Sequence, residues 1–140
     1  MENLIYSISL LLVIILIFSP SFLIYRLKKQ YSEHVFTFYI VLGVIISSIL
    51  MLVVAWWSYF SCEILLSHYG YDFELTMHHT ERLKNVSPEN LDKVKLLNQK
   101  RMGIGWPLKA IFGVIIYTPY LLIVYLLTFL YTKIRMKKKA

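Results

Sequence analysis

Three long stretches of the sequence contain no charged side chain, and they constrain the fold more than any other feature. They are residues 3–25, 35–62 and 110–132. A helix of about 20 apolar residues crosses the hydrocarbon core of a bilayer and satisfies its own backbone hydrogen bonds there. We therefore expect an all-α integral membrane protein with three transmembrane helices, at about residues 4–27, 35–60 and 108–131.

What remains outside these spans is too short for a second domain, so residues 1–140 form a single membrane domain. The extramembrane connection covers about residues 67–106. Serine, proline and glutamate at residues 87–89 favour a helix start, and Gly103 favours the end of that helix. Three apolar residues recur between them at three-residue spacing, namely Leu91, Val94 and Leu97. This pattern predicts an amphipathic helix of about fifteen residues that lies at the membrane surface.

The basic residues indicate a membrane surface rather than a nucleic acid as the partner. The formal net charge is +7, but lysine and arginine mostly flank the apolar stretches, where they orient the protein and contact anionic lipid head groups. They follow the first stretch at residues 26–29 and the last at residues 133–139, which favours an external N-terminus and an internal C-terminus. Seven basic residues at positions 82–109 argue the other way, but they begin well after the second stretch. We expect membrane lipid as a partner, no nucleic acid, and a bacterial inner membrane, with an organellar membrane as the alternative.

Covalent cross-links do not hold this fold. The single cysteine, Cys62, excludes an intrachain disulfide. Glu2 stands where a signal peptide carries basic residues, so we expect the first stretch to remain as a membrane anchor. Helix packing must therefore supply the stability.

Small residues mark a candidate packing face on the second span. Gly43 and Ser47 have the four-residue spacing that lets two helix backbones approach closely, and Ser48 adds a hydroxyl beside them. Gly113 on the third span completes the set of predicted helix-packing residues. We expect this face to pack against another span of the same chain, with self-association in a homo-oligomer as the alternative.

Proline interrupts two of the spans. Pro20 in the first and Pro119 in the third each remove a backbone hydrogen bond, so we expect a kink at both positions. Serine hydroxyls beside Pro20 are available to the freed carbonyls. Tyr117, Tyr120 and Tyr125 carry hydroxyls that need partners if they point inward.

An alternating aromatic pattern follows the second span. Tyr69, Tyr71, Phe73 and Leu75 alternate with glycine, acidic residues and threonine. An extended segment would place these four side chains on one face and the acids on the other. We predict an interaction loop that lies against the membrane or against another protein.

Acids and histidines in the connection form a candidate metal site. Glu74, His78 and Glu81 have the i, i+4, i+7 spacing that aligns side chains on one helical face, and His79 lies beside them. These residue types bind zinc, copper or iron. The alignment requires a helix where the preceding pattern alternates like a strand. We therefore favour a solvated or ion-paired acidic face, and we expect no cofactor.

Glu63 lies at the edge of the second apolar stretch. An acid inside a membrane is a functional candidate, whereas an acid at the interface reaches water or a basic partner without penalty. We interpret Glu63 as a structural interfacial acid, with proton or ligand chemistry as the alternative.

The sequence contains no motif of a known catalytic chemistry. It lacks a nucleophile and base pair, a glycine-rich phosphate loop and a cysteine cluster, so we expect no enzyme. The main hypothesis is a protein that acts by protein–protein interaction. It would be an accessory subunit of a larger membrane complex, or an immunity protein against a membrane-active toxin.

Two alternative functions stay open. The span count, the external N-terminus and the lysine-rich tail resemble those of phage holins, which form membrane-permeabilising oligomers, although the long connection departs from that pattern. A metal-responsive or pH-responsive membrane sensor would instead rest on His68, His78 and His79.

Overall fold

The computed structural model describes residues 1–30, 35–74 and 79–137 and is helical throughout these ranges apart from the turns between helices. In chain order the elements are α1 (Glu2–Gln30), α2 (Val35–His68), α3 (His79–Arg82), the 3₁₀ turn η1 (Pro88–Asn90), α4 (Leu91–Met102) and α5 (Trp106–Lys137). The described residues contain no strand. Helices α1, α2 and α5 are each long and apolar enough to cross a membrane. The predicted all-α class with three long apolar helices is therefore confirmed.

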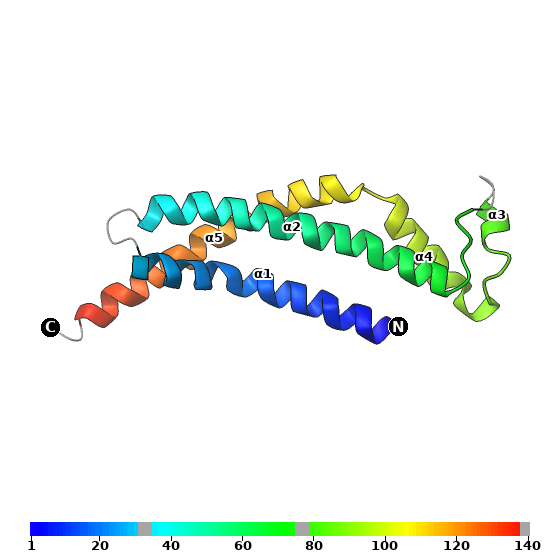
Figure 1. Cartoon of the computed structure of the whole chain (residues 1–140), viewed down its shortest axis with the longest axis horizontal. Coiled ribbons are helices and arrows are strands. Elements are labelled where there is room, and N and C mark those ends of the chain that lie inside the picture. The colour runs from blue at the N-terminus through cyan, green and yellow to red at the C-terminus, as the bar shows by residue number, and fades with distance from the viewer. Residues whose placement is uncertain (31–34, 75–78, 138–140) are drawn as a thin grey trace.

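Helix α2 is the centre of the structure, because α1, α4 and α5 all pack against it. The three long helices lie side by side (Figure 1). The elements α3, η1 and α4 gather at the end of α2 that carries His68, and we call this end the connection end. The last turns of α5 lie at the opposite end, beside the last turns of α1.

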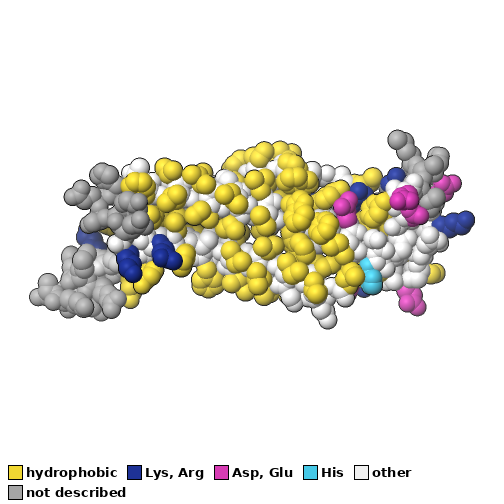
Figure 2. All heavy atoms as spheres, viewed as in Figure 1, with side chains coloured by type: hydrophobic (Ala, Val, Ile, Leu, Met, Phe, Trp, Pro, Cys, Tyr) yellow, Lys and Arg dark blue, Asp and Glu magenta, His cyan; other side chains and the backbone are white. Residues whose placement is uncertain are grey.

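The opposite end carries basic residues in the last turns of α1 and near the end of α5, and we call it the basic end. The Lys28 ammonium donates a hydrogen bond to the Thr132 hydroxyl at 3.4 Å, which places the ends of α1 and α5 together. Figure 2 shows a continuous hydrophobic surface over the middle of the molecule, with charged side chains at its two ends. This distribution is that of a protein whose middle lies in hydrocarbon.

One apolar cluster joins the three long helices. Its buried members are Ile24, Leu27, Tyr39, Tyr117 and Leu121. Gly43 lies next to it, and a Cβ atom there would lie 3.6 Å from Leu121 Cδ1 and 3.8 Å from Leu23 Cδ2. The missing side chain at Gly43 thus leaves room for a residue of α1 and a residue of α5 at the same point of α2.

The other small residues of the predicted packing face occupy different surroundings. Ser47 is buried, and its hydroxyl donates to the Val44 carbonyl at 3.0 Å. Ser48 donates to the same carbonyl at 2.7 Å and is half-buried. Gly113 faces α2, where a Cβ atom would lie 2.8 Å from Met51 Sδ. Gly43 and Gly113 of the packing face therefore meet other helices of the same chain, Ser47 is buried, and Ser48 is half-buried.

Two hydroxyl groups donate hydrogen bonds to the backbone carbonyl that Pro20 leaves without its helical donor. Proline has no N–H, so the Leu16 carbonyl loses its helical partner. The Tyr117 hydroxyl of α5 donates to this carbonyl. The Ser19 hydroxyl donates to it as well, at 3.1 Å. The freed carbonyl of α1 is thus satisfied partly from its own helix and partly from α5, as a carbonyl in hydrocarbon requires.

Two further tyrosines bind backbone carbonyls across helix contacts. Tyr120 donates to the Ile17 carbonyl at 2.9 Å, and Tyr39 donates to the Leu121 carbonyl at 2.8 Å. The first bond joins α5 to α1 and the second joins α2 to α5. Tyrosine hydroxyls therefore join α5 to α1 and to α2 in this layer.

Replacing Tyr117 with phenylalanine tests the role of the freed carbonyl. We expect Tyr117→Phe to lower the free energy of unfolding by about 1 kcal/mol, the size of a strong hydrogen bond between membrane helices. Titration of the purified protein in mixed micelles with a denaturing detergent measures this difference. Tyr131→Phe, at an exposed position of the same helix, is the matched control and should have no effect.

A second substitution separates the hydrogen bond from general packing. Pro20→Ala restores an N–H that can donate to the Leu16 carbonyl. In that background Tyr117→Phe should cause a clearly smaller loss. An equal loss with and without Pro20 would contradict the assignment of Tyr117 to the freed carbonyl.

Candidate functional site at the connection end

A second apolar cluster folds the connection onto the end of α2. Its buried residues are Leu66, Tyr71, Val86 and Val94, which come from α2, from the two loop segments and from α4. We call it the connection cluster. Tyr69, Phe73, Leu83 and Leu97 pack around it. The connection is therefore a packed structure with its own small core.

Helix α4 begins and ends close to the predicted positions. The turn η1 starts at Pro88, α4 proper runs from Leu91 to Met102, and Gly103 follows it. Val94 is fully buried in the connection cluster, whereas Leu96 on another face is 54% exposed. Helix α4 packs along α2. The described structure does not confirm its amphipathic character or its position at a membrane surface, and both remain predictions.

An ion pair between α4 and α2 is the best-built polar contact at this end. The Arg101 Nη2 atom lies 3.0 Å from Glu63 Oε1, and Arg101 Nε donates to the same oxygen at 3.2 Å. Arg101 Nη2 also donates to the Tyr59 hydroxyl at 3.4 Å. The guanidinium carbon lies 4.7 Å from the centre of the Phe73 ring and 5.6 Å from that of Tyr59. We call this group of four residues the Arg101 junction.

The Arg101 junction is partly shielded from water. The Arg101 side chain is 21% exposed and that of Glu63 is 32% exposed. Burial lowers the pKa of Arg101, but the hydrogen bond to Tyr59 and the Glu63 carboxylate outweigh it, so the pKa lies above its ordinary value. Arg101 thus stays charged and holds α4 through a planar fork that lysine cannot reproduce. Glu63 has a basic partner here, and this partner is 38 residues away in the sequence.

A second, more exposed contact joins the start of α1 to the connection. Tyr69 donates a hydrogen bond to the Glu2 carboxylate, which raises the pKa of Tyr69. The Lys93 ammonium lies 3.7 Å from the same carboxylate and 5.9 Å from the centre of the Tyr69 ring. The Lys93 and Glu2 side chains are 61% and 57% exposed, so water weakens this pair.

The predicted interaction loop is not an exposed aromatic face. Tyr71 is only 3% exposed, and its ring packs against Phe73 with a centroid distance of 5.0 Å. Gly70 has a φ of 84° and turns the chain back toward α2. A Cβ atom at Gly70 would lie 2.7 Å from the Asn85 carbonyl oxygen. Glycine is therefore required both by the positive φ and by this close approach. Residues 73–74 form a bend and Leu75 lies outside the described residues, so contact of this segment with the membrane or with another protein remains a prediction.

The candidate metal ligands do not share one helix. Residues 71–74 are not helical, and α3 comprises only His79–Arg82, so Glu74 and Glu81 do not lie on one continuous helical face. The Glu74 N–H donates instead to Asp72 Oδ1 at 2.9 Å. His78 and the side chain of His79 lie outside the described residues. Among those described, no three His, Cys, Asp or Glu side chains come close enough to hold a metal ion.

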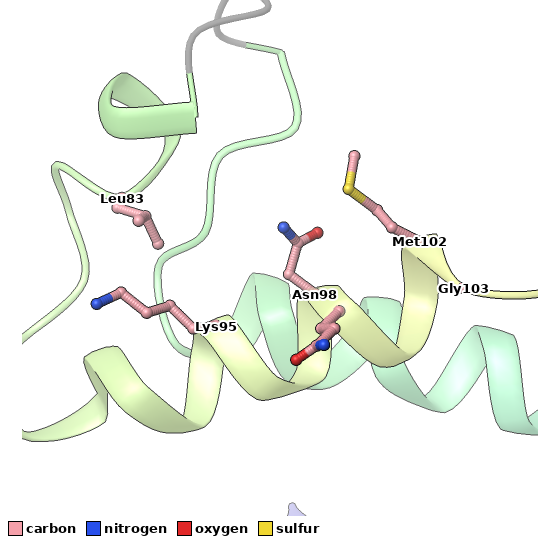
Figure 3. Close-up of a pocket in the computed structure, with 6 residues that line it drawn as sticks. Leu83, Lys95, Asn98, Met102 and Gly103 are labelled. Carbon is pink, nitrogen blue, oxygen red and sulfur yellow. The ribbon is translucent and has the colours of Figure 1, made fainter.

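A pocket of about 400 Å³ opens beside α4 (Figure 3). The residues that line it are Leu83, Lys95, Asn98, Gln99, Met102 and Gly103. Figure 3 shows Lys95, Asn98 and Met102 projecting from α4, with Leu83 across from them. This lining has one cation and two amides, and it offers no nucleophile with an adjacent base.

No protein-family model matches this chain, and comparison with curated proteins and with solved structures finds no match either.

A double-mutant cycle tests the Arg101 junction. We expect Arg101→Met and Glu63→Gln each to increase hydrogen exchange of the α4 amides, because each leaves a partly buried polar group without its partner. The coupling energy between the two changes should be about 1–2 kcal/mol, above that of a surface pair.

The exposed pair at the start of α1 is the matched control for that cycle. Lys93→Met with Glu2→Gln removes one cation and one carboxylate from the contact between α4 and α1, and its coupling should be below about 0.5 kcal/mol. Equal coupling energies in the two cycles would mean that the aromatic surroundings of Arg101 do not strengthen its ion pair with Glu63.

Proposed function

We propose that this chain is a small three-span membrane protein that acts by binding another integral membrane protein, as an accessory subunit of a larger membrane complex. The observation that carries the proposal is a groove between α2 and α5 in the apolar part of the surface. The groove has a volume of about 280 Å³. Its lining residues are Ser48, Leu52, Ala110, Ile111, Val114 and Ile115.

The shape of this groove suits a helix. Ala110 and Ser48 are small, and small residues let a second helix backbone approach closely. Ile111 and Ile115 are exposed and stand one turn apart on α5. Ridges of a partner helix pack into such a groove by van der Waals contact, which is the main force between helices in lipid. The Ser48 hydroxyl already donates to the Val44 carbonyl, so its burial under a partner leaves no polar group unsatisfied.

Aromatic residues support a position of the groove within the bilayer. Trp57 donates to Ser9 at 3.0 Å near the connection end, and Trp106 begins α5. Tryptophan favours the head-group region. Helix α2 contains 34 residues and is about 50 Å long at the helical rise, against about 30 Å of hydrocarbon, so its end projects beyond the tryptophans. The groove lies on the hydrocarbon side of Trp57 and Trp106, so the partner is a transmembrane helix.

We also propose an external connection end and an internal basic end, in a bacterial inner membrane. Arg26, Lys28, Lys29 and Lys133 lie at the basic end, and the bond from Lys28 to Thr132 joins their helices. Positive charges next to spans favour the cytoplasmic side. At the connection end, Glu63 neutralises Arg101, so Arg101 contributes less to the positive charge that decides the orientation.

The packed connection favours an accessory subunit over a holin-like oligomer. The connection cluster and the Arg101 junction give this region a defined structure, where a holin needs only a short turn. An immunity protein would use the same groove against the helix of a toxin. The identity of the partner distinguishes these cases.

Filling the groove tests the proposal. Ser48→Phe should place a ring between α2 and α5 and exclude the partner helix, since overpacking an interface displaces it. The full chain is isolated from native membranes in lipid-preserving polymer particles, and co-purifying proteins are quantified by mass spectrometry. We expect a stoichiometric membrane partner with the natural sequence and about a tenfold loss with Ser48→Phe, the effect of about 1.4 kcal/mol.

Ile49→Phe is the matched control, because Ile49 is the exposed neighbour on α2 that does not line the groove. It should retain the partner. Isolation of the natural protein alone would contradict the accessory role. Isolation with copies of itself would favour the holin-like alternative, and membrane leakage on expression would then be measured.

Cysteine labelling tests the orientation. In a Cys62→Ser background, Ser87→Cys reports the connection end and Lys133→Cys reports the basic end. Both positions are exposed. A membrane-impermeant maleimide should label Ser87→Cys in intact cells and label Lys133→Cys only after permeabilisation. The reverse pattern would overturn the orientation.

A further inference from the structure

The corner between α4 and α5 combines exposed apolar side chains with two lysines. Helix α4 ends at Met102 and α5 begins at Trp106. Met102, Ile104 and Leu108 are 61%, 53% and 46% exposed. Figure 3 shows Met102 projecting from the last turn of α4. Three large apolar side chains at one turn of the chain are not explained by packing within the molecule.

Two lysines from different helices meet at the same corner. Lys109 of α5 donates a hydrogen bond from its ammonium to the Lys100 carbonyl of α4, at 3.3 Å. In the described part of the chain neither lysine forms an ion pair, and the carboxylate of Glu63 is engaged by Arg101. The corner therefore carries positive charge without a protein counter-ion among the described residues.

The corner lies at the depth expected of lipid head groups. Arg101, next to Lys100, contacts Tyr59, which follows the tryptophan pair of α2. Lys109 is three residues from Trp106. Tyrosine and tryptophan gather where head groups meet hydrocarbon, and lysine side chains reach from that level to phosphate. Apolar side chains beside them enter the acyl boundary.

We propose that the α4–α5 corner binds the phosphate head group of an anionic phospholipid. Lys100 and Lys109 hold the phosphate from two helices, and Met102, Ile104 and Leu108 contact the upper part of the acyl chains. Charge complementarity selects this occupant, since two lysines without a carboxylate partner at one corner, among the described residues, favour an anionic head group over a zwitterionic one. The lipid also links the end of α4 to the start of α5. The site requires only that the chain spans a bilayer and does not depend on a protein partner.

Lipid retention tests this site with the full chain. The protein is reconstituted in vesicles of equal parts phosphatidylglycerol and phosphatidylcholine, extracted gently, and the retained lipids are measured by native mass spectrometry. We expect phosphatidylglycerol to be enriched about threefold or more over phosphatidylcholine, as expected for two lysines at an anionic surface. Lys100→Gln with Lys109→Gln should lower the enrichment at least about threefold. Lys100→Arg with Lys109→Arg should preserve it.

Matched controls distinguish lipid binding at the α4–α5 corner from a general effect of positive charge. Lys84→Gln with Lys95→Gln removes the same charge earlier in the connection and should leave the enrichment unchanged. Excess inorganic phosphate should not displace the lipid, because the apolar contacts belong to the acyl chains. Equal enrichment in the natural protein and in Lys100→Gln with Lys109→Gln would overturn the proposal, as would displacement by phosphate alone.

Discussion

A backbone carbonyl in hydrocarbon must have a donor, and this requirement at Leu16 organises the contact between α1 and α5. Pro20 removes the donor that the helix would supply. No water replaces it at that depth, so the Tyr117 hydroxyl of the neighbouring helix does. The bond joins residues 101 apart in sequence and sets one helix against the other. Tyr39 sets the third helix in the same way through the Leu121 carbonyl. Gly43 then lies where side chains of both neighbours reach α2.

The two ends of α2 are held by different forces. Between spans, lipid is as apolar as the side chains, so close packing and a few hydrogen bonds supply the stability. Beyond the tryptophans water is present, and burial of Val94 and Tyr71 in the connection cluster becomes favourable. The Arg101 junction adds an ion pair whose guanidinium packs on aromatic rings. The excess length of α2 provides the surface on which this second core forms.

The sequence predicts the helices well because the absence of charge over more than twenty residues is a local and decisive signal. It predicts contacts less well, because they depend on the fold. Glu63 was identified as an interfacial acid, but nothing local indicates Arg101 as its partner. The alternation from Tyr69 to Phe73 suggests an extended interaction loop, whereas Tyr71 is buried in the connection cluster and Gly70 has a positive φ. The sequence indicates a backbone carbonyl freed by Pro20 and a tyrosine hydroxyl at Tyr117 that needs a partner. Only the register of the helices brings the two groups together.

The groove between α2 and α5 and the α4–α5 corner adjoin each other, because Lys109 and Ala110 are consecutive in α5. They nevertheless depend on different physics. The proposed contact between a partner helix and the groove would rest on shape and dispersion, which salt does not screen. Attraction of a head group to Lys100 and Lys109 is electrostatic and falls as ionic strength rises. A protein partner that dissociates in high salt would therefore be held through the lipid at the α4–α5 corner. A partner that remains bound in high salt would be held by the groove itself.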